Sequence, residues 1–165
     1  MLKSVEKQMI RIFLAALCLA MPAGAQHLEF ISEIELRSSE DKFGGLSAIH
    51  VFDGGETFLA VSDGGRFQSG TIKRTDGKLS GGQLNPIERM IGVNGTPYKG
   101  ADSDAEGIAV DAAGNIFVSF ENNHRLRMFT NTSAPARSIT GAPAFKSLQS
   151  NSGLGGLAVT PQGHL

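Results

Sequence analysis

The 165-residue sequence is poor in cysteine, has no tryptophan and carries almost balanced charge. Its single cysteine, Cys18, lies in an apolar stretch near the N-terminus, so the rest of the chain cannot form an internal disulfide and must be stabilised by packing or by bound ions. The formal net charge of −1 gives no general attraction to nucleic acid or to an anionic membrane surface. We therefore expect neither of these partners.

The first 25 residues have the pattern of a signal peptide. Basic residues precede the apolar stretch Ile12–Ala20, and "AGA" at 23–25 supplies the small residues of a cleavage site before Gln26. The apolar stretch is too short to span a bilayer. The sequence therefore predicts a periplasmic or secreted protein whose mature chain, residues 26–165, contains no cysteine and does not associate with the membrane.

An internal repeat is the most informative feature of the mature chain. The segments "GGLSAIHVFDGGETFLAVSD" (44–63, the first repeat), "EGIAVDAAGNIFVSFE" (106–121, the second repeat) and "GGLAVTPQGHL" (155–165, the third repeat) share one plan. Each has a glycine, a short apolar strand and a glycine-containing turn. Gly45, Gly107 and Gly156 lie 62 and 49 residues apart, a spacing that fits one propeller blade per repeat.

Turn signals and alternating apolar residues predict strands within these repeats. The 21 glycines and the absence of long helical periodicity favour an all-β chain. The "DG" pair Asp76–Gly77 predicts a tight hairpin turn. The predicted strands are residues 46–52, 57–62 and 71–74 around the first repeat, and 107–110, 116–120 and 125–130 around the second.

The third repeat stops just after its turn, before the second strand that the other two repeats have. Propellers close a ring of at least four blades, so that each blade face is covered. We therefore expect an all-β fold that is a partial β-propeller of about two and a half blades. On this expectation, residues 26–165 are the N-terminal part of one domain that is truncated at its C-terminus.

Carboxylates gather at one end of the second repeat. Glu106 begins the first strand of a predicted hairpin and Glu121 ends the second strand, so both lie at the end opposite the turn. Asp104 reaches the same end from the preceding loop, and Asp63 holds the position of Glu121 in the first repeat. Such hard oxygen ligands suit Ca²⁺ better than zinc or copper. The alternative is a solvated rim without a ligand, because Asp is a common turn residue.

The position of Glu106 is instructive, because the aligned residues of the other two repeats are Gly44 and Gly155. This acid is therefore an addition to the repeat and not a requirement of it. Near it, His124 is a candidate proton donor, and Arg125 and Arg127 share one strand face and are candidates to bind a phosphate. The alternatives are an exposed loop histidine and a solvated sheet face.

Three segments resemble the phytase-like, esterase-like propeller family of secreted bacterial proteins. They are "GGLSAI" with "FLAVSDGG", then "DAEGIAVDAAGNIFVSFENNHRLRMF", then "NSGLGGLAVTPQG", and the resemblance runs from about Phe43 to the end of the chain. It implies a β-propeller with cation-dependent hydrolase activity towards phosphate or other esters. It also implies metal or substrate contacts at Asp63, Asp104, Glu106 and Glu121. The third segment departs from the family pattern, because Gly155 stands where an acid is expected.

The reaction that this resemblance implies would use Glu106, Glu121 and His124 for catalysis, Arg125 and Arg127 for substrate binding, and a calcium ion on the four acids. Two alternatives stay open. The phrase "GIAVDAAGNIFV" also occurs in gluconolactonase-like proteins, which suggests a lactone hydrolase. A non-enzymatic periplasmic propeller that binds a ligand or partner also agrees with the missing acid. In the enzyme interpretations the partner is a small-molecule ester, and the complete protein is a monomer.

Overall fold

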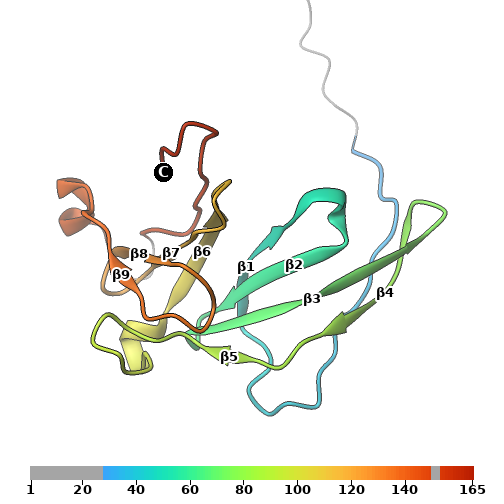
Figure 1. The fold of residues 1–165 in the computed structure, drawn as a ribbon, viewed down its shortest axis with the longest axis horizontal. Coiled ribbons are helices and arrows are strands. Elements are labelled where there is room, and N and C mark those ends of the chain that lie inside the picture. The colour runs from blue at the N-terminus through green and yellow to red at the C-terminus, as the bar shows by residue number, and fades with distance from the viewer. Residues whose placement is uncertain (1–27, 150–152) are drawn as a thin grey trace, which may run out of the picture. The chain divides into compact units, whose positions relative to one another are not determined.

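The computed structural model describes residues 28–149 and 153–165 (Figure 1). The predicted signal peptide lies outside the described residues. The chain divides into Met1–Ile31 and Ser32–Leu165, and every strand lies in the second part. The described residues contain strands and three short 3₁₀ turns but no α-helix, and among them no helix is long and apolar enough to cross a membrane. The predicted all-β class is confirmed.

The first sheet is antiparallel and contains β1 to β4 in sequence order, with β5 added beside β3. The strands are β1 (Leu46–Val51), β2 (Thr57–Ser62), β3 (Arg66–Thr75), β4 (Lys78–Leu84) and β5 (Glu88–Arg89). The apolar side chains of β2 are buried, as expected for an inner strand of aromatic and β-branched residues. Asp76 and Gly77 both have positive φ and join β3 to β4, as the tight hairpin turn requires.

β3 is much longer than the predicted strand of residues 71–74. Its first half, "RFQSG", contains polar and small residues that hide the strand in the sequence. Gly70 is needed inside this strand, because a Cβ there would press against the Gln83 carbonyl and the Phe58 ring. The glycine therefore marks a close approach between strands and not a turn.

The second sheet has four antiparallel strands in the order β6, β7, β8, β9. They are β6 (Ala105–Val110), β7 (Ile116–Phe120), β8 (Arg125–Phe129) and β9 (Arg137–Ser138). A 3₁₀ turn, η2 (Gly100–Ser103), leads directly into β6. The other two short turns are η1 (Asp53–Gly55), which precedes β2, and η3 (Pro143–Ser147), which follows β9.

The two sheets pack against each other through one shared apolar core. Leu59, Val61 and Phe67 of the first sheet are buried together with residues of the second, and the Phe67 and Phe129 rings meet edge to face with centroids 5.1 Å apart. Within the described residues the sheets do not close a ring. This arrangement of successive packed sheets confirms the predicted partial propeller.

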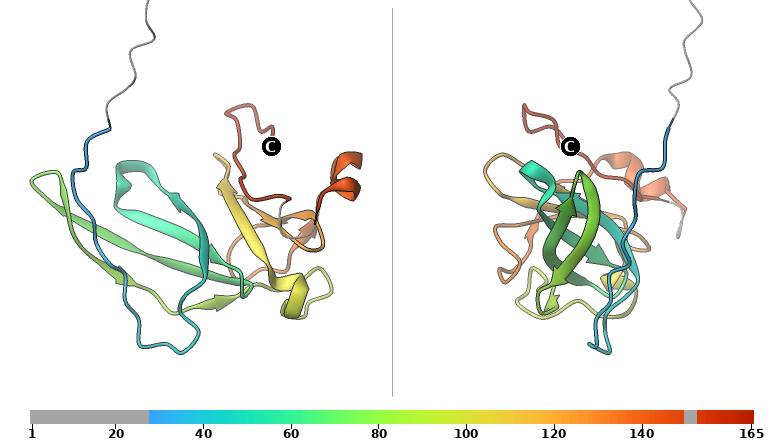
Figure 2. Two further views of the ribbon diagram at one scale, coloured as in Figure 1. Left: turned by 180° about the vertical axis from the view of Figure 1, so that it is seen from behind. Right: turned by 90° about the vertical axis from the view of Figure 1, so that its right-hand side faces the viewer.

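The third repeat continues the same arrangement beside β6, in the dark red segment of Figure 2. The Ser119 hydroxyl donates a hydrogen bond to the Leu154 carbonyl at 2.8 Å, and a Cβ on Gly107 would lie 3.0 Å from the Leu157 Cβ. Residues 153–160 are not assigned as a strand. The turn that follows nevertheless repeats the turn after β6, because the Thr160 N–H donates to the His164 carbonyl at 2.8 Å.

The ladders correct the sequence alignment of the first repeat. In both inner hairpins the register shifts at a β-bulge: Leu46 pairs with Ser62 and Ala48 with Val61, just as Ala105 pairs with Phe120 and Gly107 with Ser119. Ser47 is therefore the counterpart of Glu106.

The expected equivalence of Gly45 with Gly107, and of Gly44 with Glu106, was wrong. The backbone places Gly45 opposite Asp63 through a 3.0 Å hydrogen bond, and it places Asp104 opposite Glu121 through the same bond at 2.9 Å. The match of Asp63 with Glu121 holds, because both residues directly follow the second strand of their hairpins. The glycine in the sequence misled the alignment because ladder hydrogen bonds, and not glycine positions, decide the register.

Candidate functional site

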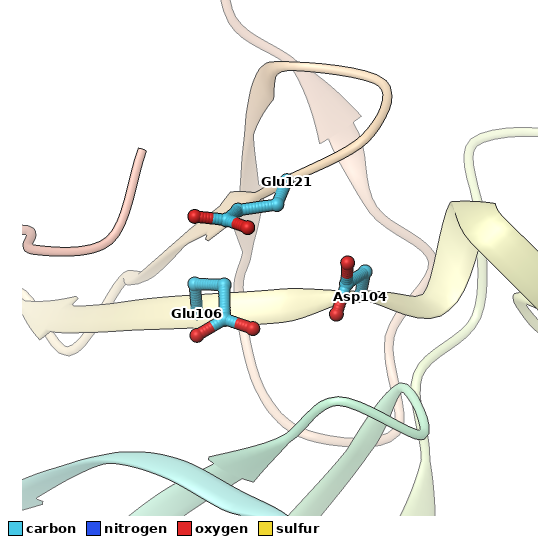
Figure 3. A group of neighbouring side chains, drawn as sticks. All are labelled: Asp104, Glu106 and Glu121. Atoms are coloured by element: carbon cyan, nitrogen blue, oxygen red, sulfur yellow. The ribbon is translucent and has the colours of Figure 1, made fainter. Parts of the chain in front are cut away.

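Three carboxylates meet where β6 begins and β7 ends (Figure 3). One oxygen from each of Asp104, Glu106 and Glu121 lies within 4.8 Å of the other two. Asp104 precedes β6, Glu106 is the extra residue of the bulge, and Glu121 is brought beside Asp104 by its own backbone hydrogen bond. We call these three side chains the acid cluster. All three are half-buried.

The environment of Glu106 shows how closely the charges approach one another. Burial raises the pKa of the Glu106 carboxyl above its usual value of 4.5, and the negative charges of Asp104 and Glu121 raise it further. A hydrogen bond with Asp104 and the charge of Asp63 act in the same direction. Asp63, which follows β2 of the first sheet, is thus within electrostatic reach of Glu106, although it lies outside the acid cluster.

Neighbouring loops hold the acid cluster in place. The Asn122 side-chain amide donates a hydrogen bond to the Asp104 carboxylate, and the Gly153 N–H donates to Glu121 Oε1 at 3.3 Å. The backbone just before the third repeat thus contacts the acid cluster. A Cβ on Gly155 would meet no atom within 4 Å, so lack of space does not explain the missing acid there.

The donor set of the acid cluster fits calcium. Its ligands are carboxylate oxygens, without the sulfur or imidazole donors that zinc and copper prefer. Calcium takes six to eight oxygens, so three carboxylates supply about half of a coordination sphere and leave positions for water or a substrate oxygen. Mutual repulsion of the three charges also favours binding of a cation.

Arg125 has a place that the sequence did not predict. Its side chain is only 8% exposed, with the guanidinium 4.2 Å from the centre of the Phe120 ring and 5.1 Å from that of Tyr98. Its Nη1 donates to the Asn123 carbonyl at 2.8 Å, and its Nη2 donates to the Asp102 carbonyl. Arg125 therefore ties together the two loops that carry Asp104 and Glu121.

Arg127 lies two residues further along β8 and lines the same groove as Arg125. The structure thus brings the two predicted arginines to one face, together with Lys99 and Tyr98. Tyr98, the only tyrosine of the chain, was not among the residues predicted from the sequence. Its position in the loop before η2 carries no pattern that would have marked it.

His124 does not join the acid cluster. Its Nε2 lies 3.0 Å from the Gln149 carbonyl, and its ring occupies the space that a Cβ on Gly153 would need. His124 therefore contacts the segment that leads into the third repeat. The missing side chain at Gly153 makes this contact possible.

These features define a class of protein, a β-propeller with an acid cluster at the end of an inner hairpin. Comparison with known families agrees with the resemblance seen in the sequence. The family model Phytase-like, described as "Esterase-like activity of phytase", matches residues 41–165, and the chain belongs to this family. No curated protein and no solved structure gave a significant match.

Proposed function

We propose that this protein is a secreted, calcium-dependent hydrolase of phosphoric or other esters, and that the acid cluster is its reaction centre. The observation that carries this proposal is the convergence of Asp104, Glu106 and Glu121 within 4.8 Å at adjoining strand ends. Membership of the phytase-like family supports the reaction class. The predicted signal peptide supports secretion.

The three acids have different environments, which suggests different roles. When calcium is bound, it supplies charge neutralisation for the ester and a lowered pKa for a coordinated water. Asp104, held by Asn122, and Glu121, held by the Gly153 N–H, are oriented as ligands. Glu106, the third carboxylate of the cluster, would also bind the cation, and its second carboxylate oxygen would accept the proton of the attacking water.

Asp63 adds negative charge from the first sheet to the side of Glu106, which strengthens the attraction for a cation. We assign no proton transfer to His124, because its Nε2 faces the Gln149 carbonyl. The substrate is a small-molecule ester, and the protein acts as a monomer.

The test is calcium-dependent turnover of a chromogenic phosphate ester by the full chain. We expect activity with calcium, none after chelation, and a fall of about 10²- to 10⁴-fold in kcat for Glu106→Gln, the range seen when a general base is removed. Glu56→Gln is the matched control, because Glu56 is an exposed acid in the turn before β2, at the opposite end of its hairpin.

Other outcomes would favour the alternatives. Opening of a lactone without release of phosphate would indicate a gluconolactonase-like hydrolase. Calcium binding that depends on Glu106, without turnover of either substrate, would indicate a periplasmic propeller that binds a ligand or partner.

A further inference from the structure

An exposed turn between β5 and η2 contains Asn94, the only asparagine of the chain that is followed directly by glycine. Two backbone hydrogen bonds form the turn. The Gly95 N–H donates to the Gly92 carbonyl at 2.9 Å, and the Gly92 N–H donates to the Thr96 carbonyl at 2.7 Å. Asn94, Gly95 and Thr96 are all exposed, so solvent reaches the whole tip of the turn.

The side-chain carbonyl of Asn94 accepts two hydrogen bonds from one residue. The Thr96 N–H donates to Asn94 Oδ1 at 3.0 Å, and the Thr96 hydroxyl donates to the same oxygen at 2.7 Å. Two fixed donors at these distances stabilise the negative charge that develops on a carbonyl oxygen when a nucleophile attacks its carbon. The arrangement around Asn94 Oδ1 therefore favours attack on Asn94 Cγ.

The neighbouring nucleophile is the backbone nitrogen of Gly95. A Cβ on this glycine would meet no atom within 4 Å, so neither its own side chain nor a neighbouring atom shields the nitrogen. The Gly95 N–H must first leave the Gly92 carbonyl. Opening an exposed turn costs little free energy compared with unfolding the core, so this bond does not prevent the reaction.

Asn131 provides a matched site in the same chain. The Ser133 N–H donates to Asn131 Oδ1 at 3.0 Å, which repeats the backbone contact made at Asn94. The Ser133 hydroxyl, however, donates to Glu88 Oε2 at 2.8 Å and so gives Asn131 no second donor. The next residue is Thr132, whose branched side chain crowds its own backbone nitrogen. Asn131 thus has one of the two donors and lacks the open neighbour.

We propose that Asn94 is a site of spontaneous deamidation through a cyclic imide. The Gly95 nitrogen loses its proton and bonds to Asn94 Cγ. The bond between Cγ and Nδ2 then breaks, and Nδ2 leaves as ammonia with that proton. Water opens the imide at either carbonyl and leaves aspartate or isoaspartate at position 94. This inference does not depend on the acid cluster or on the proposed function.

The modification changes the charge of a groove. Asn94 lines the same groove as Lys99, Arg125 and Arg127, so a carboxylate at position 94 makes that groove less positive. Isoaspartate also adds one methylene to the main chain inside the turn, which weakens the hydrogen bond between the Gly92 N–H and the Thr96 carbonyl.

The test is incubation of the full, folded chain at mildly alkaline pH, followed by mass spectrometry of its peptides with separation of aspartate from isoaspartate. We expect conversion at Asn94 to be at least tenfold faster than at Asn131. Thr96→Val removes the hydroxyl from an exposed residue and keeps the backbone N–H, so it should slow conversion at least threefold. Thr96→Ser restores the hydroxyl and should restore the rate.

The same proteins unfolded in urea are the control, because there Thr96→Val and the wild type should react at equal rates. Three results would overturn the proposal. One is a folded chain that stays unmodified at Asn94 while the unfolded chain reacts. Another is an unchanged rate in folded Thr96→Val, which would leave only the general reactivity of an asparagine before glycine. The third is equal conversion at Asn94 and Asn131.

Discussion

The inner hairpins of the two sheets, β1–β2 and β6–β7, have the same backbone arrangement and differ at a few side chains. Both hairpins have a bulge in the first strand and a backbone hydrogen bond that closes the open end. The three corresponding positions are Gly45, Ser47 and Asp63 in the first sheet and Asp104, Glu106 and Glu121 in the second. The two hairpins therefore have the same backbone, and the candidate site results from two acids, Asp104 and Glu106, that only the second hairpin has.

A second pair of positions differs in the same way. Arg66 begins β3 as Arg125 begins β8, and each donates to the carbonyl two residues before it, Gly64 at 3.0 Å and Asn123 at 2.8 Å. Only Arg125 also reaches the Asp102 carbonyl and covers an aromatic ring. The second sheet, which carries the acid cluster, is thus also the one in which an arginine joins two loops by hydrogen bonds.

The largest expected effect comes from making the second sheet resemble the first at the bulge. Glu106→Ser should abolish stabilisation by calcium, since two carboxylates remain where three were. Calcium at 100 times its Kd stabilises a single-site protein by about 2.7 kcal/mol, so the loss is visible as a missing rise in Tm. Ser47→Ala, at the counterpart bulge, should leave the calcium-dependent rise intact. An equal loss in both variants would contradict a site confined to the second sheet.

The two arginines provide the next comparison. Arg125→Met should lower the free energy of unfolding by about 2 to 3 kcal/mol, because the Asn123 and Asp102 carbonyls lose a charged donor that is itself buried. Arg66→Met should cost less than about 1 kcal/mol, since Arg66 makes one such bond and is more exposed. Urea unfolding of the calcium-free proteins measures both values. Similar losses in the two variants would show that Arg125 contributes no more to stability than Arg66.

The smallest effect concerns pH. Because the pKa of Glu106 is raised in the folded protein, the folded state binds that proton more tightly than the unfolded state does. In the absence of calcium, this contribution to stability is present below about pH 4.5 and is lost as pH rises through the higher folded pKa. Stability measured across this window should fall less steeply in Glu106→Gln.

The matched control for pH is Asp111, whose pKa is lowered chiefly by a hydrogen bond from the Asn115 side chain. Its contribution has the opposite sign, since it is present above about pH 3.8 and is lost as pH falls. An unchanged pH profile in Glu106→Gln would mean that the acid cluster does not hold a proton.

Local sequence patterns predicted much of the fold and part of the candidate site. The strands Thr57–Ser62 and Ile116–Phe120 have the predicted ends, and the turn at Asp76–Gly77 forms. These predictions succeeded because alternation and turn chemistry act between near neighbours. The same locality let hairpin geometry predict that Glu106 and Glu121 lie side by side.

Features that depend on distant parts of the chain were missed. The first half of β3 was not predicted, because its small and polar residues are buried only through packing against other strands. The first repeat was aligned three residues out of register, because its glycine was matched to Gly107, whereas the ladder hydrogen bonds pair Ala48 where Gly107 stands in the second repeat. The roles of Arg125 and Tyr98 were hidden for a similar reason, since their partners lie in other loops.

The sequence by itself determined the repeat, the β-strands and turns, and the presence of extra acids in one copy, because each of these depends on the order of neighbouring residues. The tertiary structure decided which residue of the first copy corresponds to Glu106, which loops Arg125 joins, and that Tyr98 and Arg127 share a groove. Those outcomes depend on ladder register and on packing between segments far apart in the chain, where hydrogen bonds and burial act across space and not along the sequence.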